Sequence, residues 1–259
     1  MDWTHKKTWL HDSNPSFKLA VMIVLFFFIL FIHNPNVQLN ILFFLLGTLI
    51  FLSGQRLWMI GLFLLPFLFV FFTSSISMIM FGKGETIWFE WGLISISAES
   101  FYRGIHIGLR AINFGLLGLI FVFTTRPVLL FYSMMQQWKL KPTFAYSFMA
   151  GIRLLPTFVE EFNTLRNAMY VRGANVKKGI FFTMKTYSIP LLSQSIRKAH
   201  RIAAAMEAKG FTNEKRTYYY QQSYSRYDAF LFIYIVVMMV AIYLLTQNVA
   251  YFPVDNVKS

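Results

Sequence analysis

Two segments of the chain carry the same pattern of residue types, and each ends in a cation followed by glycine. Residues 168–173 read Ala-Met-Tyr-Val-Arg-Gly, and residues 205–210 read Ala-Met-Glu-Ala-Lys-Gly. A Lys or Arg in a last helical turn complements the helix dipole, and glycine commonly follows the end of a helix. Such a cation can also form charge-assisted hydrogen bonds with a partner's carboxylates or carbonyls. Because the whole pattern recurs after 37 residues, a shared binding task for Arg172 and Lys209 is favoured over coincidence.

Each pattern closes a long amphipathic segment. Apolar residues recur in steps of three and four from Ile152 to Arg172 and again from Ile189 to Lys209. This spacing predicts two helices, each about 30 Å long at roughly 1.5 Å per residue. We expect prolines 156 and 190 in the first helical turns, where proline is tolerated, and glycines 173 and 210 just past the ends. Small residues in the second segment predict that the two helices cross or pack together.

The composition is that of a membrane protein. Of the 259 residues, 56% are hydrophobic and only 14% are charged, against about 25% charged residues in a typical soluble domain. A spanning helix needs about 20 residues. The chain therefore predicts an all-α integral membrane protein with about five transmembrane helices, in the apolar runs Phe17–Ile32, Val37–Leu52, Leu57–Phe81, Ile105–Phe123 and Ala229–Leu245. The absence of cysteine excludes disulfides and thiolate metal sites.

The charges predict an orientation through the positive-inside rule. Lys6, Lys7, Lys18 and Arg56 place the N-terminus and the loop after the second span in the cytoplasm, whereas the acidic stretch 82–103 suits the outside. We expect three parts: a four-span bundle over residues 1–125, a cytoplasmic domain with the amphipathic helices over 126–226, and a C-terminal transmembrane helix with its tail over 227–259.

The cytoplasmic part holds nearly all of the net charge. Between Arg126 and Arg226 there are 16 Lys and Arg against 4 Glu, which accounts for +12 of the formal +13. An ordinary cytoplasmic loop, an anionic-lipid contact or a nucleic-acid surface would each explain such a block. The cations are spaced along amphipathic helices without an aromatic stacking platform, so we expect no nucleic-acid partner.

The fourth span carries a stripe of small residues at steps of four and three: Gly104, Gly108, Ala111, Gly115 and Gly118. Such a stripe lets another helix approach closely. Packing inside the bundle and contact with a second membrane subunit are both open. His106 and Arg110 lie in the same span, and a structural role is favoured for them over a substrate pathway.

Nothing in the chain indicates catalysis. There is no G-x-x-x-x-G-K-(S/T) phosphate-binding loop, and the five histidines are scattered without metal-ligand spacing. Glu160 and Glu161 are neighbours on a predicted helix, so their side chains point about 100° apart. They favour a solvated or partner-facing charge over an acid–base pair. We expect no cofactor or metal bound to this chain.

With these residues identified, the chain resembles the transmembrane T component of energy-coupling factor (ECF) transporters, the family that includes the cobalt transporter subunit CbiQ. Residues 14–19 are similar to the family's Asp-Pro-x-x-Lys-Leu, and residues 108–125 resemble its Arg-containing span. Residues 153–161 look like the lead-in to the first coupling helix, and the two patterns ending in Gly173 and Gly210 resemble its paired Ala-Arg-Gly motifs. Val171, Lys209 and Asn14 depart from the family pattern, and Lys209 lacks the planar fork of arginine.

The resemblance implies a non-catalytic subunit of a multi-pass transporter in a bacterial or archaeal cell membrane. In this family two ABC-type ATPase subunits hold the ATP and bind the coupling helices, and a separate S component binds a vitamin, a vitamin precursor such as that of thiamine, or a transition-metal ion. Arg172 and Lys209 would then be the docking cations, and glycines 173 and 210 would permit the close turn. The contact would be completed by Ala168, Met169, Ala205, Met206 and Glu207. A stand-alone permease and a membrane-anchored binder of anionic lipid or nucleic acid are the alternatives.

Overall fold

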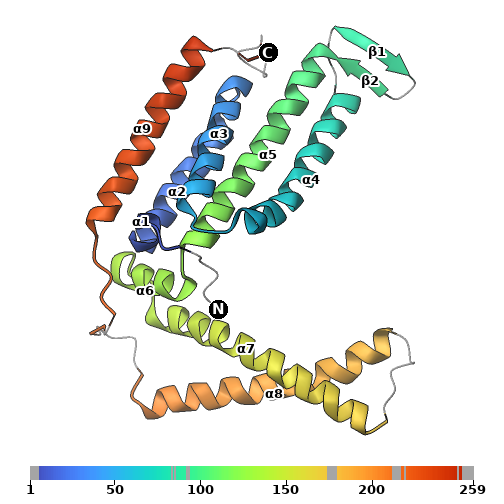
Figure 1. The fold of residues 1–259 in the computed structure, drawn as a ribbon. Helices are drawn as coiled ribbons and strands as arrows, with labels where there is room; N and C mark the ends of the chain where they lie inside the picture. The colour runs from blue at the N-terminus through green and yellow to red at the C-terminus, as the bar shows by residue number, and fades with distance from the viewer. Residues whose placement is uncertain are drawn as a thin grey trace. The chain divides into compact units, whose positions relative to one another are not determined.

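The computed structural model describes residues 6–82, 84, 86–91, 94–173, 180–211, 217–218, 220–249 and 251–252. The chain divides into two compact units, here called the spanning unit (residues 1–133 and 222–259) and the crossing unit (residues 134–221). Figure 1 shows the elements of both. Their bounds are α1 Trp9–Asp12, α2 Pro15–Phe31, α3 Pro35–Leu52, α4 Leu57–Phe81, β1 Ile87–Trp91, β2 Ile94–Ser97, α5 Ala98–Thr124, α6 Pro127–Gln137, α7 Pro142–Val171, α8 Ile180–Ala208 and α9 Arg226–Asn248.

The spanning unit confirms the prediction of an all-α membrane protein. Among the described residues, α3, α4, α5 and α9 are long and apolar enough to cross a bilayer, and α2 is a shorter apolar helix of 17 residues. At about 1.5 Å per residue α2 is about 26 Å long, close to the roughly 30 Å of a hydrocarbon core. The helices α2 and α3 both begin with an Asn-Pro pair, in which Asn14 and Asn34 accept hydrogen bonds from the backbone N–H two residues on.

The segment before α5, which its charges suggested to be an outer loop, contains a short β-hairpin. Strands β1 and β2 pair antiparallel, and α5 begins at Ala98, seven residues before the apolar run. The helix starts early because Ser97 and Ser100 cap it reciprocally and Glu99 stands in its first turn, where a carboxylate is favoured by the helix dipole. Of the charges that suggested an outer loop, Lys83 and Glu85 lie outside the described residues.

Helix α5 forms the centre of the spanning unit, with buried residues along most of its length. Its small-residue stripe faces α4 at three of the four glycines. A side chain added at Gly104 or Gly108 would meet Ser75 of α4, and one added at Gly115 would meet the ring of Phe67. At Gly118 there is open space. Most of the stripe therefore serves packing within this chain, where missing side chains allow α4 and α5 to approach closely.

A buried polar cluster joins segments that are far apart in the sequence. The backbone N–H of Asn14 donates to Asp228 Oδ1 at 2.6 Å, and Ser133 Oγ donates to Asn14 Oδ1 at 2.6 Å. Lys18 is fully buried, and its Nζ donates to the Thr124 carbonyl at 3.0 Å. The start of α2 is thus tied to α9, α6 and the last residue of α5. Lys18, counted in the sequence as a loop charge, instead satisfies a helix C-terminus inside the protein.

The crossing unit corrects the placement of two prolines. Helix α7 begins at Pro142 and α8 at Ile180, about ten residues before the starts expected from the apolar stripes. Pro156 and Pro190 therefore lie inside the helices and not in their first turns. The first-turn position of α7 is taken by Pro142, where a proline loses no hydrogen bond. An interior proline costs about 3 kcal/mol, so neighbouring contacts must offset it.

Candidate docking site on two crossing helices

The first candidate tip is the end of α7. The helix ends at Val171, the N–H of Arg172 donates to the Ala168 carbonyl at 3.1 Å, and Gly173 turns the chain with φ of 66°. Such a left-handed conformation is strained for residues with a side chain, which explains the glycine. Arg172 and Gly173 are exposed, as are Tyr170 and Val171, at 82% and 83%. The tip thus presents a cation beside two uncovered apolar side chains.

The second tip, the end of α8, has the same stop. Gly210 has φ of 70°, its N–H donates to Glu207 O at 2.9 Å, and the N–H of Phe211 donates to Met206 O at 3.0 Å. These two bonds form a Schellman motif, which satisfies the last carbonyls of the helix. Lys209 is exposed. The sequence prediction that these glycines end the helices is confirmed, and the repeat is therefore a repeat of backbone geometry as well as of residue types.

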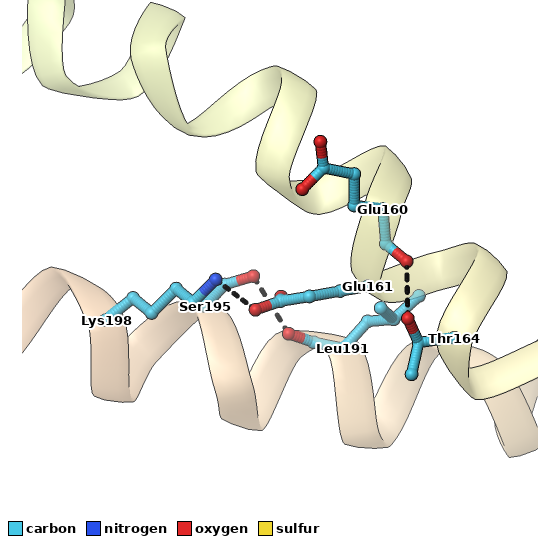
Figure 2. Close-up of polar contacts among 6 residues, drawn as sticks. All are labelled: Glu160, Glu161, Thr164, Leu191, Ser195 and Lys198. Carbon is cyan, nitrogen blue, oxygen red and sulfur yellow. Dashed lines mark hydrogen bonds and ion pairs between the residues drawn. The ribbon is translucent and has the colours of Figure 1, made fainter. Parts of the chain in front are cut away.

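Helices α7 and α8 cross, as predicted, but most of the small residues of α8 that suggested the crossing, such as Ala199 and Ala203, are exposed. An ion pair joins the two helices near the crossing. Glu161 of α7 binds the ammonium group of Lys198 of α8, while the carboxylate of Glu160 points away from α8 (Figure 2). A ring contact between Phe162 and Tyr187, with centroids 5.6 Å apart, also links the helices. Of the two adjacent glutamates, only Glu160 is therefore exposed.

The ion pair occupies equivalent positions of the internal repeat. Glu161 stands eleven residues before Arg172, and Lys198 stands eleven residues before Lys209. Each basic tip is therefore about 16 Å along its own helix from the pair, at roughly 1.5 Å per residue. The segments from the ion pair to the two tips, Glu161–Arg172 and Lys198–Lys209, therefore have equal length.

The two tips lie at opposite ends of α7. Phe211, next to the Lys209 tip, makes an edge-to-face ring contact with Tyr146 near the start of α7, with centroids 5.5 Å apart. Arg172 ends the same helix, 26 residues further on, or about 40 Å at 1.5 Å per residue. Figure 1 shows α7 and α8 running in opposite senses from the crossing. Two separate proteins could each bind one tip.

The predicted apolar stripes are largely uncovered. Leu155, Phe158 and Val159 of α7 and Ile189, Leu192 and Ile196 of α8 are exposed, Leu192 at 63%. Met169, Met206 and Ala168 are half-buried, and Ala205 and Glu207 are exposed. An exposed apolar surface of this extent marks an interaction site. The apolar stripes that predicted the two helices therefore leave most of their area available for contact with another molecule.

A hollow of about 460 Å³ lies beside the crossing, between the ion pair and Ala168. Its walls include three cations of α8, namely Arg197, Lys198 and Arg201, with Glu161 and Thr164 from α7. Lys198 was not among the predicted site residues. The sequence does place Lys198 and Glu161 at equivalent positions, each eleven residues before a basic tip. That the two side chains form an ion pair between the helices is seen only in the folded structure. No group of three metal-ligating side chains occurs among the described residues.

Comparison with known proteins gives a consistent result. Residues 6–219 match the model of the CbiQ family, cobalt transport protein. The energy-coupling factor transporter transmembrane protein EcfT of Limosilactobacillus fermentum is 30% identical over 243 residues, covering 89% of this chain and 91% of the relative. The protein of the same name from Staphylococcus aureus is 26% identical over 254 residues, with 93% and 94% covered. That of Acidaminococcus fermentans is 29% identical over 243 residues, with 85% and 86% covered.

Proposed function

The chain belongs to the CbiQ family and is a transmembrane component of an energy-coupling factor transporter, and we propose that it transmits ATP-driven motion from two ATPase subunits to a substrate-binding S component. The chain itself catalyses nothing in this proposal. ATP is bound and hydrolysed by the partners, and the S component selects a vitamin, a vitamin precursor or a transition-metal ion.

One observation carries the proposal: two exposed cations stand on identical glycine-stopped helix ends, at opposite ends of α7. In the proposed complex Arg172 and Lys209 each bind carboxylates or carbonyls of one ATPase subunit. Charge-assisted hydrogen bonds of this kind are about twice as strong as neutral ones. Gly173 and Gly210 keep the cation at the surface by turning the backbone away at once.

The crossing provides the mechanical link in this proposal. A helix is stiff along its axis, so a force applied at either tip reaches the crossing about 16 Å away without being lost in loops. The exposed apolar residues of α7 and α8, such as Leu155 and Leu192, then offer a surface for the S component. Motion of the ATPases would thus displace the membrane partner.

The orientation proposed from charge places the basic end of the spanning unit in the cytoplasm. Lys7, Arg56 and Arg126 stand at the end where α4 begins and α5 ends, whereas the β1–β2 hairpin stands at the other end of α4 and α5 (Figure 1). An excess of Lys and Arg on the cytoplasmic side is the general rule for short loops.

Charge reversal tests the docking role. The double variant Arg172→Glu/Lys209→Glu is expected to reduce co-purification of the ATPase subunits at least about a hundredfold, because interface hot spots are each worth about 2 kcal/mol or more. Uptake of the radiolabelled substrate should stop as well. The matched control is Arg166→Glu/Lys185→Glu, which makes the same charge change at exposed positions of the same helices and should leave association within about threefold.

The decisive contrary result is a double tip variant that retains its ATPases at wild-type yield and supports transport. Identifying the membrane protein that co-purifies in mild detergent would test the second half of the proposal. A small S component, with its bound vitamin or metal ion, is expected. Transport by the isolated chain in liposomes without ATP would instead support a stand-alone permease.

A further inference from the structure

A cavity of about 370 Å³ lies in the spanning unit, whereas the two tips belong to the crossing unit. Its walls come from α1, the loop between α3 and α4, the first turns of α4, the last turns of α5 and the start of α6. The α1 segment is fixed over this end of the helices by two hydrogen bonds. The Lys6 N–H donates to the Gly54 carbonyl at 3.1 Å, and the Thr8 hydroxyl donates to the Leu52 carbonyl at 2.6 Å.

Three residues of the wall have a buried polar atom without a hydrogen-bond partner in the described part of the chain. They are Gln55 with Nε2, His11 with Nε2 and Thr125 with Oγ1. Gln55 is only 9% exposed. An unpaired buried polar atom costs about 1–3 kcal/mol, so three at one cavity indicate that the cavity receives a polar group.

The unpaired atoms are mainly hydrogen-bond donors. The backbone N–H of Thr8 donates to His11 Nδ1 at 3.2 Å, and the neutral tautomer that accepts this bond carries its proton on Nε2. Burial and the positive charge of Lys18 lower the pKa of His11 below its ordinary value, so the ring is neutral at pH 7. The Gln55 amide group and the Thr125 hydroxyl also donate. A ligand with several acceptor oxygens fits this set.

The charge of the wall favours an anion. Lys7 and Arg126 both line the cavity, against the single carboxylate of Asp12. A phosphate group presents acceptor oxygens to donors and negative charge to cations. Basic pockets between transmembrane helices on the cytoplasmic side commonly bind lipid head groups.

The other wall is apolar and continues onto the outside of the helices. Met59 and Phe63 of α4 and Leu119 and Val122 of α5 line it, and Phe63 and Val122 are also exposed on the outer surface of the unit. That surface of a spanning helix faces hydrocarbon. A ligand with a phosphate at one end and a long apolar chain at the other matches both walls, whereas free phosphate would leave the apolar wall without a partner.

We propose that this cavity binds one anionic glycerophospholipid, with its phosphate held by Lys7, Arg126, His11 and Gln55 and one acyl chain lying along Phe63 and Val122. The bound lipid would bridge α1, the α3–α4 loop and the α5–α6 junction. The proposal depends on the membrane-spanning fold and not on ATPase binding, so the two can fail separately. It also concerns the spanning unit and not the basic crossing helices.

Native mass spectrometry of the purified full-length chain tests the proposal. The detergent-solubilised protein is titrated with phosphatidylglycerol and, in parallel, with phosphatidylcholine. One phosphatidylglycerol should be retained per chain at least about tenfold more tightly than phosphatidylcholine. Equal retention of the two lipids would overturn the proposal.

A pair of matched variants separates the cavity from general attraction to basic residues. Lys7→Gln/Arg126→Gln should weaken retention of phosphatidylglycerol about tenfold or more. Lys6→Gln/Arg56→Gln makes the same charge change at exposed neighbours that do not line the cavity, and retention should stay within about twofold. If both pairs weaken retention equally, the contact is general electrostatic attraction and the proposed site is wrong.

The acyl chain is tested without changing charge. Val122→Trp fills the apolar wall at an exposed position that tolerates a larger side chain, so the folded protein should elute normally in gel filtration while retention falls. Unchanged retention in this variant would contradict the proposed path of the chain. Glycerol phosphate is the head-group probe, and its displacement of phosphatidylglycerol at equimolar concentration would show a phosphate site and overturn the lipid assignment.

Discussion

In the spanning unit polar side chains are buried among apolar helices, whereas in the crossing unit apolar side chains are exposed on basic helices. Asn14, Lys18 and Asp228 have hydrogen-bond partners inside the protein, because an unpaired polar group there would be costly. Leu155 and Leu192 have no such cover in the described residues. At these positions the spanning unit supplies the partners of its own polar groups, whereas the crossing unit leaves apolar surface that other proteins would cover in the proposed complex.

The two units also differ in whether a regularly spaced set of residues is covered or exposed. In the spanning unit the small-residue stripe of α5 is filled by α4, at Gly104, Gly108 and Gly115. In the crossing unit the repeated tips at Arg172 and Lys209 are exposed. The stripe of α5 packs on another helix of the same chain and therefore serves packing. The two basic tips remain at the surface and are therefore candidates for binding another protein.

The largest expected effect comes from the same substitution made once in each unit. Leu116→Ser, at a position only 1% exposed, removes a core side chain of α5 and should destabilise the isolated chain by about 2–5 kcal/mol. Leu192→Ser, at an exposed position of α8, should leave the melting temperature unchanged and reduce assembly with the partners and uptake. Thermal unfolding in detergent checks the first half and co-purification the second. A melting temperature lowered equally by both changes would abolish the contrast between the units.

The buried cation of the spanning unit gives the next largest effect. Lys18→Met keeps the length of the side chain but leaves the Thr124 carbonyl without its donor and removes a positive charge near Asp228. We expect destabilisation by about 1–3 kcal/mol, the cost of an unpaired buried polar group. Lys6→Met at an exposed position is the control, and thermal unfolding is again the measurement. Equal stability of the two variants would show that Lys18 is a topological signal only.

The stripe of α5 offers a smaller and more local test. Gly115→Ala adds a methyl group that meets the Phe67 ring, whereas Gly118→Ala adds one in open space. The first change should destabilise the chain by about 1–2 kcal/mol through overpacking, and the second should have no effect on stability. If Gly118→Ala lowers uptake in a normally folded chain, Gly118 faces another membrane subunit. The conclusion that the stripe serves packing within this chain would then not extend to Gly118.

The smallest expected effect concerns the ion pair at the crossing. Glu161→Gln or Lys198→Gln should change the stability of the isolated chain by at most about 1 kcal/mol, because both groups are partly exposed. Uptake should fall severalfold if the ion pair fixes the orientation of α7 relative to α8. The exchange Glu161→Lys/Lys198→Glu should restore part of that loss, and equal uptake in single and exchanged variants would assign the pair no mechanical role.

Much of the candidate site could be predicted from sequence because its determinants are local. A glycine after a basic residue stops a helix through the conformation of one or two residues, and the apolar period of α7 and α8 depends on neighbours three and four positions away. The first residues of the helices were harder to predict from the sequence. Ala98 and Pro142 begin their helices through capping and proline geometry, while the apolar period that guided the prediction begins several residues later.

The sequence by itself determined the membrane class, the apolar spans and the two matched basic tips, since composition, hydrophobic period and helix stops are properties of short stretches of chain. Only the tertiary structure decided that Lys18 meets Thr124, that Glu161 meets Lys198, and that a donor-rich cavity forms where α1 covers the end of α5. These contacts join residues from 37 to more than 100 positions apart. The free energy of each contact depends on how far its groups are buried and on which partners they meet. No local sequence pattern specifies either, so these contacts could be identified only in the folded structure.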